Sequence, residues 1–384
     1  MTATANILES ASPRPRSRAW IGRLGEFLVV GGITPFLFPL AWLLRRSVGL
    51  DDAQFAAGFL TFYGAHVIND PHFAVTYPLF YRDVRGRAFG GAFAPMQRIR
   101  YWIAGIIVPV GLAAWGLTAI THKSALQLGL MIQLMFLLVG WHYVKQGFGV
   151  MTVLSARRGV RYTTRERWAI LAHCYAGWAY AWASPYDPSR QVEEKGVVYM
   201  TIAHPIGLER LTHVVFLFTI IPLAWVLVRK WRKEGRLPIF TPLIALLSSI
   251  WVWSIYSSID PVVIYFIPAL HSVQYLYFVR LMRGNEAKER EGPPLFEVSA
   301  KIRLGTLAIT ALGLGWLFFH GAPTYFDDLF VSKRAAFDSP LGPTPYFAAI
   351  YTFVNIHHFA MDAVIWRRDN PETRYLLAQD LNTN

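Results

Sequence analysis

The sequence predicts an all-α protein: a polytopic integral membrane helix bundle of about ten transmembrane helices. The first observation behind this prediction is composition. Of the 384 residues, 54% are hydrophobic and 16% are charged, whereas soluble globular chains carry about 25% charged residues. The second observation is a series of apolar runs, each close to the roughly 20 residues that a helix needs to cross a bilayer. The same composition excludes disordered, coiled-coil and disulfide-rich secreted chains.

The predicted spans alternate with loops of different charge. Loops after the even-numbered spans are rich in Arg and Lys, as in residues 157–167, and loops after most odd-numbered spans are poor in them. Because basic loops stay on the cytoplasmic side, this alternation predicts that both termini are cytoplasmic. The spans are expected at residues 26–44, 53–70, 99–120, 125–150, 168–184, 211–229, 237–257, 260–282, 301–320 and 345–366.

One transmembrane domain, residues 23–368, is expected between a cytoplasmic N-terminal tail, residues 1–22, and a cytoplasmic C-terminal tail, residues 369–384. The first apolar run is too long for the apolar region of a signal peptide. We therefore expect no cleaved signal peptide and a location in a bacterial-type inner (plasma) membrane, surrounded by membrane lipids. The net charge of +13 comes from short basic loop clusters. They are too short for a nucleic-acid groove, so no nucleic-acid partner is expected.

Histidines at membrane depth are the candidate functional residues. An ionisable side chain inside a bilayer is costly, usually faces the bundle interior and marks a functional site. Four even-numbered spans each place a His in their inner half, and side chains on facing helices can assemble a metal site. The candidate metal ligands are His66, His142, His271, His357 and His358. Imidazoles without thiolates suit iron, zinc or copper. Haem ligation by two of the histidines is a competing interpretation.

Polar residues follow these histidines at helical spacing. A carboxylate or amide one turn away lies on the same helix face. A carboxylate there can accept the proton of the ring nitrogen that does not bind the metal, which fixes the ring's orientation. The predicted supporting residues are Asp70 beside His66, Gln146 beside His142, Gln274 beside His271, and Asp362 beside His357 and His358. Pro71 resists helix continuation, so it is expected to end the second span and leave His72 at its cytoplasmic edge.

Four short motifs around these histidines resemble those of the bacteriorhodopsin-related-protein-like family of membrane β-carotene 15,15′-dioxygenases. His66 and Asp70 match its His-x-x-x-Asp motif, and Trp141-His142-Tyr143 matches an aromatic motif around a single His. His357 and Asp362 match its His-x-x-x-x-Asp motif. The third motif, His-x-x-x-His, is altered here. His271 occupies its first position, and Tyr275 stands where the family has its second His.

The resemblance implies an iron-dependent oxygenase that cleaves a long polyene. The altered motif leaves open whether His358, His72 or His173 replaces the missing ligand, whether Tyr275 binds the metal, or whether the site has only three strong ligands. Tyr275 and Lys145 are the candidate catalytic residues. Lys145 follows His142 by three positions, so it either extends to the lipid headgroups or forms a Schiff base.

The function expected from these features is a histidine-ligated, non-haem iron oxygenase that uses dioxygen. Its substrate is an apolar lipid or a polyene such as a carotenoid, which enters sideways from the bilayer, and oxidative cleavage of a double bond is the expected reaction. The first alternative is a di-iron lipid desaturase or hydroxylase, which needs more closely spaced histidines. The second alternative is a haem-binding, transport or assembly protein of the membrane. The oligomeric state stays open.

Overall fold

The computed structural model describes residues 16–184, 191–194, 197–200, 204–234, 240–257, 259–331 and 339–377. Within these ranges the protein is helical, apart from a short hairpin of β1 (Gln191–Glu194) and β2 (Val197–Met200). The all-α prediction is therefore confirmed at the level of fold class. The predicted N-terminal tail lies largely outside the described residues.

The helices follow one another with few interruptions. Several of them contain a π-helical segment (η1 to η4), in which the backbone holds one extra residue per turn. The helices are α1 (Arg16–Phe27), η1 (Leu28–Gly32), α2 (Thr34–Val48), α3 (Leu50–Ala65), α4 (Asn69–Tyr81), α5 (Val84–Ala88), α6 (Pro95–Trp102), η2 (Ile103–Ile107), α7 (Val108–Thr121), α8 (Ala125–Arg157), α9 (Thr164–Ala183), α10 (Ile206–Glu234), α11 (Phe240–Leu247), η3 (Ser248–Ile255), α12 (Val263–Glu291), α13 (Ala300–Trp316), η4 (Leu317–Gly321), α14 (Ala322–Phe330), α15 (Pro345–Ile365), the 3-10 turn η5 (Pro371–Thr373) and α16 (Arg374–Leu377).

Each of the ten predicted spans is largely helical, but fewer of these helices are apolar enough to cross a membrane by themselves. Among the described residues, four helices are long and apolar enough: Pro95–Thr121, Ala125–Arg157, Ile206–Lys233 and Ala300–Phe330. A fifth is added if Gly22–Gly32 and Thr34–Val48, bent by 71° from each other, count as one span. Helices α12 and α15 are less apolar because their buried faces carry His, Gln, Asn and Asp. The chain is thus a membrane protein by the length and apolarity of its helices.

The second predicted span is broken. Helix α3 ends at Ala65, and the chain turns before α4 begins at Asn69. Pro71 was expected to end a helix. It lies instead in the first turn of α4. A proline is tolerated there because the first N–H groups of a helix have no partner within it. Consequently His66 and Asp70 lie on different helices, and His72 lies inside α4.

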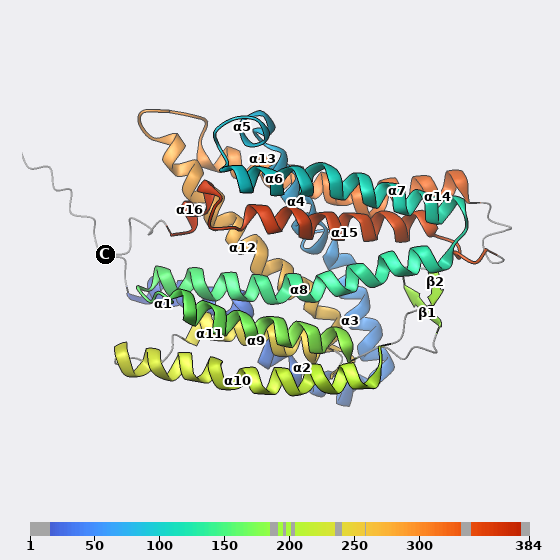
Figure 1. Cartoon of the computed structure of the whole chain (residues 1–384), viewed down its shortest axis with the longest axis horizontal. Coiled ribbons are helices and arrows are strands. Elements are labelled where there is room, and N and C mark those ends of the chain that lie inside the picture. The colour runs from blue at the N-terminus through green and yellow to red at the C-terminus, as the bar shows by residue number, and fades with distance from the viewer. Residues whose placement is uncertain are drawn as a thin grey trace, which may run out of the picture.

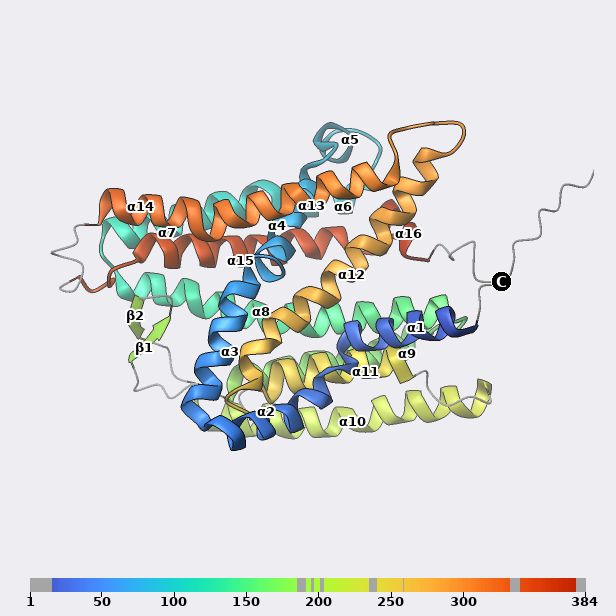
Figure 2. The same ribbon diagram turned by 180° about the vertical axis from the view of Figure 1, so that it is seen from behind.

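Helix α8 occupies the middle of the bundle. In Figure 1, α15, α8, α9 and α10 lie one beside the next, and the contacts agree with this order. Helix α12 crosses the bundle diagonally and contacts α3, α4 and α13 (Figure 2). In both views α1 and α16 lie at the same end of the bundle, and the β1–β2 hairpin lies at the other end.

The outer helices expose large apolar side chains. Phe218 on α10 is 66% exposed and Ile309 on α13 is 72% exposed. Contiguous apolar surface of this kind is rare on soluble monomers. The exposed apolar surface fits a bundle whose outer face contacts the hydrocarbon of a membrane. In that environment apolar side chains gain little from burial, so the polar side chains decide which face of a helix turns inward.

A buried cluster of three arginines and two glutamates joins α4, α5, α12 and η5 at the end where α16 lies. We call it the arginine–glutamate cluster: Arg82, Arg87, Arg283, Glu286 and Glu372. Arg82 binds both acids, with Nη1 3.0 Å from Glu286 Oε1 and Nη2 2.7 Å from Glu372 Oε1. Arg87 and Arg283 also pair with Glu372, and Arg283 pairs with Glu286. Burial alone would raise the pKa of Glu372, but the three arginines hold this pKa below its ordinary value.

The chain after α15 packs against the bundle. The predicted C-terminal tail begins at residue 369, but Asn370 is buried and its amide donates to the carbonyl of Ile365 at 2.7 Å. Tyr375 and Leu376 of α16 are also buried. Residues 370–377 therefore belong to the folded domain, because α16 packs against α12 and α8.

Candidate metal centre

Four buried histidines meet in the interior of the bundle. We call this group the four-histidine centre: His72 of α4, His142 of α8, His271 of α12 and His358 of α15. None of the four is more than 4% exposed. The ring of His72 lies 4.9 Å from that of His271 and 4.6 Å from that of His358, centroid to centroid. The ring of His142 lies 4.9 Å and 5.0 Å from the same two rings.

The ring nitrogens that face the centre lack partners. Within the described part of the chain, no hydrogen bond reaches Nε2 of His72, His142 or His358, or either ring nitrogen of His271. A buried polar atom without a partner costs about 1–3 kcal/mol, so such a group needs an explanation. Ligand atoms of His72, His142 and His271 lie within 4.8 Å of one another, as do those of His142, His358 and Asp362. These residues could hold a metal ion, and such an ion would account for both the convergence and the missing partners.

Hydroxyl groups orient two of the rings through their second nitrogen. Ser272 Oγ lies 3.2 Å from His72 Nδ1 and donates to the carbonyl of Pro268 at 2.8 Å. Since a hydroxyl has one proton, Ser272 accepts the Nδ1–H of His72. Nε2 of His72 is then the unprotonated nitrogen, with its lone pair free for a metal.

A directed chain of hydrogen bonds orients His358 in the same way. Tyr275 donates its hydroxyl proton to Asp362 Oδ1 at 2.7 Å. Thr76 Oγ1 lies 3.0 Å from Tyr275 Oη and 2.8 Å from His358 Nδ1. Because the tyrosine proton is already committed to the carboxylate, Thr76 donates to Tyr275 and accepts from His358 Nδ1–H. The lone pair of His358 is therefore on Nε2, which faces the centre.

Asp362 borders the centre with its other oxygen. Oδ2 lies 3.4 Å from His358 Nε2 and 3.8 Å from His142 Nε2. Among the described residues it has no hydrogen-bond partner. This oxygen can bind an ion directly or balance the charge of an ion held by the imidazoles.

Aromatic rings enclose the four histidines. Phe359 lies 4.8 Å from His142, Tyr143 lies 4.3 Å from His271, and Phe73 lies 4.8 Å from His358, centroid to centroid. These rings keep the centre apolar. The rings of His271 and His358 each lie 4.6–5.0 Å from those of both His72 and His142, so they occupy the space that a porphyrin between His72 and His142 would need. The geometry thus fits a single ion better than haem.

Comparisons with protein-family models, curated proteins and solved structures find no match. The resemblance to the membrane dioxygenases therefore stays a prediction that rests on four short motifs.

The structure brings His142, His271 and His358 together, and it places the other two predicted ligands elsewhere. His357 points away from the centre, with Tyr77 Oη 3.2 Å from its Nδ1 and Tyr81 Oη 3.3 Å from its Nε2. Its neighbour His358 takes the inner position, because it is four residues before Asp362 and so shares a helix face with it. His66, at the end of α3, stacks on His320 of η4.

The predicted supporting residues have several different roles. Asp362 contacts the centre, and Tyr275 holds Asp362 and does not face the metal position directly. Gln146 and Gln274 brace the helices: Gln146 Nε2 lies 2.7 Å from Gln274 Oε1, and Gln274 Nε2 donates to the carbonyl of Val30 at 2.7 Å. Asp70 lies near His66, but also beside His320, with its Oδ2 2.9 Å from His320 Nε2.

Two further predicted candidates lie on the α9 side of α8. Lys145 reaches Tyr175, with Nζ 3.5 Å from the tyrosine hydroxyl. His173 is buried between α9 and α10, and its Nδ1 lies 3.0 Å from Thr219 Oγ1. Neither belongs to the four-histidine centre, although His173 was one possible replacement for the altered ligand.

His72 is the member of the four-histidine centre that the sequence did not place there with certainty. Its signal was present: Asp70-Pro71 is typical of the first turn of a helix, so His72 can lie inside a new helix. His320 was not among the predicted ligands, and it lies in the π-helical segment η4, which sequence periodicity does not reveal.

Proposed function

We propose that this protein is a membrane oxygenase whose four-histidine centre holds one non-haem iron ion and whose substrate is a long apolar molecule such as a polyene. His72, His142, His271 and His358 would hold the ion, with Asp362 beside it. A ferrous ion in such a site supplies the binding and activation of dioxygen. The observation that carries the proposal is the set of unpartnered, buried imidazole nitrogens that face one another inside a membrane bundle.

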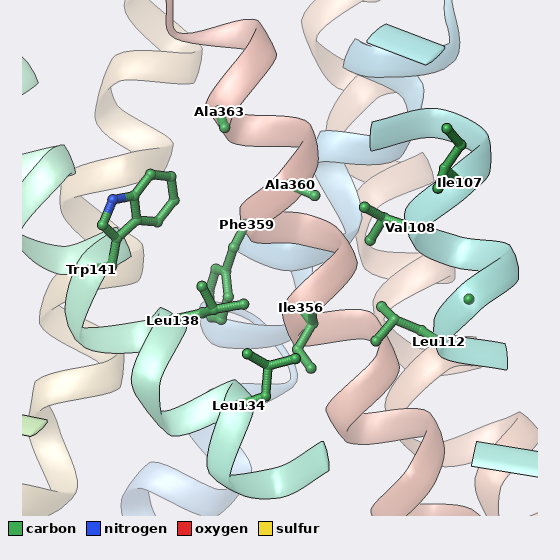
Figure 3. A pocket seen from close by; sticks show the side chains of 11 residues that line it. Ile107, Val108, Leu112, Leu134, Leu138, Trp141, Ile356, Phe359, Ala360 and Ala363 are labelled. Carbon is green, nitrogen blue, oxygen red and sulfur yellow. The ribbon is translucent and has the colours of Figure 1, made fainter. Parts of the chain in front are cut away.

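An apolar groove next to the centre supports the substrate class. It has a volume of about 420 Å³ and lies between α7, α8 and α15, within the usual range for small-molecule sites. In Figure 3, Leu134 and Leu138 of α8 face Val108 and Leu112 of α7 across α15. The wall of the groove is almost entirely hydrocarbon, so it suits a chain without polar groups.

Phe359 connects the groove to the centre. Its ring lines the groove and also lies 4.8 Å from the ring of His142. A substrate in the groove is therefore separated from the histidines by one side chain. Holding one double bond at a fixed place beside the reacting group can contribute several kcal/mol to catalysis.

Residues of this chain orient the centre and exclude water from it. Thr76 and Ser272 fix two imidazoles, and Tyr275 fixes the carboxylate of Asp362. Phe359 and Tyr143 pack on the other two rings, those of His142 and His271. In oxidative cleavage of a C=C bond, that bond breaks and each of its carbons takes one atom of dioxygen, which gives two carbonyl products. The overall reaction needs no external reductant, unlike desaturation or hydroxylation.

The proposed topology places the end with α1, α16 and the arginine–glutamate cluster in the cytoplasm. Basic residues gather at that end, including Arg157 and Arg158 at the end of α8 and Arg232 and Lys233 at the end of α10. The positive-inside rule assigns such an end to the cytoplasm. All ten predicted segments would then lie within the membrane, the polar inner ones shielded by the apolar outer ones.

The direct test combines metal analysis with turnover. Protein purified in detergent is expected to contain iron without the Soret band of haem, and to consume dioxygen when β-carotene or another long polyene is added without a reductant. Aldehyde products are measured by chromatography and mass spectrometry. Turnover that needs a reductant would favour the desaturase or hydroxylase alternative, and a Soret band would favour haem binding.

Filling the groove is expected to block the substrate without affecting the metal. Ala363 lines the groove and its side chain is exposed, so Ala363→Trp adds bulk there without disturbing the core. We expect iron content to stay at the wild-type level while the rate of polyene cleavage falls at least about tenfold, because the substrate can no longer lie beside Phe359. The matched control is Ala113→Trp, an exposed alanine of α7 outside the groove lining. Equal activity of the two variants would exclude the groove as the substrate site.

A further inference from the structure

A second group of potential ligands lies outside the four-histidine centre. His66 at the end of α3, Asp70 in the first turn of α4 and His320 in η4 offer ligand atoms within 4.8 Å of one another. The two imidazoles are nearly parallel, with centroids 4.1 Å apart and planes 11° apart. Asp70 Oδ2 lies 2.9 Å from His320 Nε2. Three residues from two distant segments thus meet at one point.

The backbone is shaped to bring these residues together. Gly315 of α13 packs directly on α4: a Cβ at this position would lie 2.9 Å from the carbonyl carbon of Asp70. No larger residue fits there without displacing backbone. Two residues later, the helix widens into η4 (Leu317–Gly321), which carries His320. Such π-helical segments occur frequently at functional sites, because one extra residue changes the direction of the side chains that follow.

The ring of His66 is oriented by a backbone carbonyl. Its Nδ1 lies 3.3 Å from the carbonyl oxygen of Phe62, one turn earlier on α3. A carbonyl only accepts, so Nδ1 carries the proton and the lone pair of His66 is on Nε2. A ligating histidine that donates its other N–H to a carbonyl is the usual arrangement in metal sites.

We propose that His66, Asp70 and His320 bind a second divalent transition-metal ion, in a site that exchanges its ion faster than the four-histidine centre. Two imidazoles and one carboxylate are a common ligand set for Zn²⁺, Fe²⁺ and similar ions, and they leave coordination positions open. The side chain of His320 is 27% exposed and that of Asp70 is 4% exposed. The site is therefore open on one side, whereas the four-histidine centre is closed.

The two sites are separate although they are close in sequence. Asp70 and His72 are two residues apart on α4, and successive residues of an α-helix differ by about 100° around the axis. Their side chains thus point to roughly opposite faces of the helix. Asp70 faces η4, and His72 faces α12. One ion cannot serve both groups, so the inference does not depend on the oxygenase proposal.

Cobalt(II) is a suitable probe, because its visible absorption reports binding to nitrogen and oxygen ligands. Metal-free protein in detergent is titrated with Co²⁺, and the bound metal is counted after gel filtration. We expect about two ions per chain in the wild type and about one in His320→Gln. A chelator should remove the ion of the outer site first, and this fast phase should be missing in His320→Gln. His66→Gln is the second variant, and His122→Gln, at an exposed position after α7, is the control.

The outcomes separate this inference from the proposed function. Unchanged Co²⁺ binding in both His320→Gln and His66→Gln would overturn the second site. A single bound ion that is lost only in His142→Ala would also overturn it, while leaving the four-histidine centre intact. A single ion lost only in His320→Gln would support the second site and contradict the oxygenase centre. Circular dichroism and thermal denaturation of each variant show whether it is folded.

Discussion

Replacing His142 by alanine is expected to remove the metal ion of the four-histidine centre while the protein stays folded. His142 belongs to both groups of ligand atoms, one with His72 and His271 and the other with His358 and Asp362. No other residue is shared in this way among those described. Loss of a residue that only supports a ligand typically costs 10–100-fold in metal affinity, so loss of this ligand should cost at least about 100-fold.

The matched control for this variant is His173→Ala. His173 is also buried, and it lies on the next helix, but its ring contacts Thr219 and Phe216, away from the centre. Both variants create a cavity of similar size, so a general loss of stability should affect both. Metal content is measured by mass spectrometry after gel filtration. If His142→Ala binds iron as tightly as the wild type, or if His173→Ala loses as much, the assignment of the centre is wrong.

Replacing Glu372 by glutamine is expected to lower the free energy of unfolding by about 3 kcal/mol, because the change leaves three arginines, two of them buried, with one acid in place of two. Glu372 joins Arg82, Arg87 and Arg283, which come from three different elements. Its side chain is only 17% exposed, so water cannot replace the lost charge efficiently. Thermal denaturation in detergent measures the loss.

The same variant changes how stability depends on pH. Because the arginines lower the pKa of Glu372 in the folded protein, its contribution is complete above the ordinary pKa of a glutamate. It is lost as the pH falls through the lower, folded value. The wild type should therefore lose stability in acid more steeply than Glu372→Gln. Glu289→Gln is the control: this glutamate pairs with Arg374 at a 57% exposed position, where a pair contributes less than about 1 kcal/mol. Equal losses in both variants would contradict a special role for the cluster.

The apolar runs were sufficient to predict a helical membrane bundle, because length and hydrophobicity depend only on local sequence. The apolar runs were not sufficient to predict which helices face lipid and which lie inside the bundle. The inner helices α12 and α15 are less apolar than a typical span, and only their packing against α4, α8 and α13 explains why. The bend between α3 and α4 was also missed, because residues 53–70 were treated as one span although this stretch is short and rich in small and polar residues.

The chemistry of the candidate centre was easier to predict than its exact members. A His in each of four spans indicated convergence, and His142 and His271 do meet in the structure. The choice between His357 and His358 depends on how α15 is rotated about its axis, because neighbouring side chains of a helix point about 100° apart. Choosing between His66 and His72 needs the helix break before Asn69. Both choices depend on tertiary packing, which a single sequence does not contain.

The first turn of α4 would couple the two proposed metal sites. Asp70 and His72 are attached to the same rigid segment, one on each side of it. An ion held by Asp70 would restrict the rotation of that segment and so hold the imidazole of His72 at a fixed angle. Filling the outer position should then increase the affinity of the inner one, and thermodynamic reciprocity requires the inner ion to strengthen the outer one by the same factor.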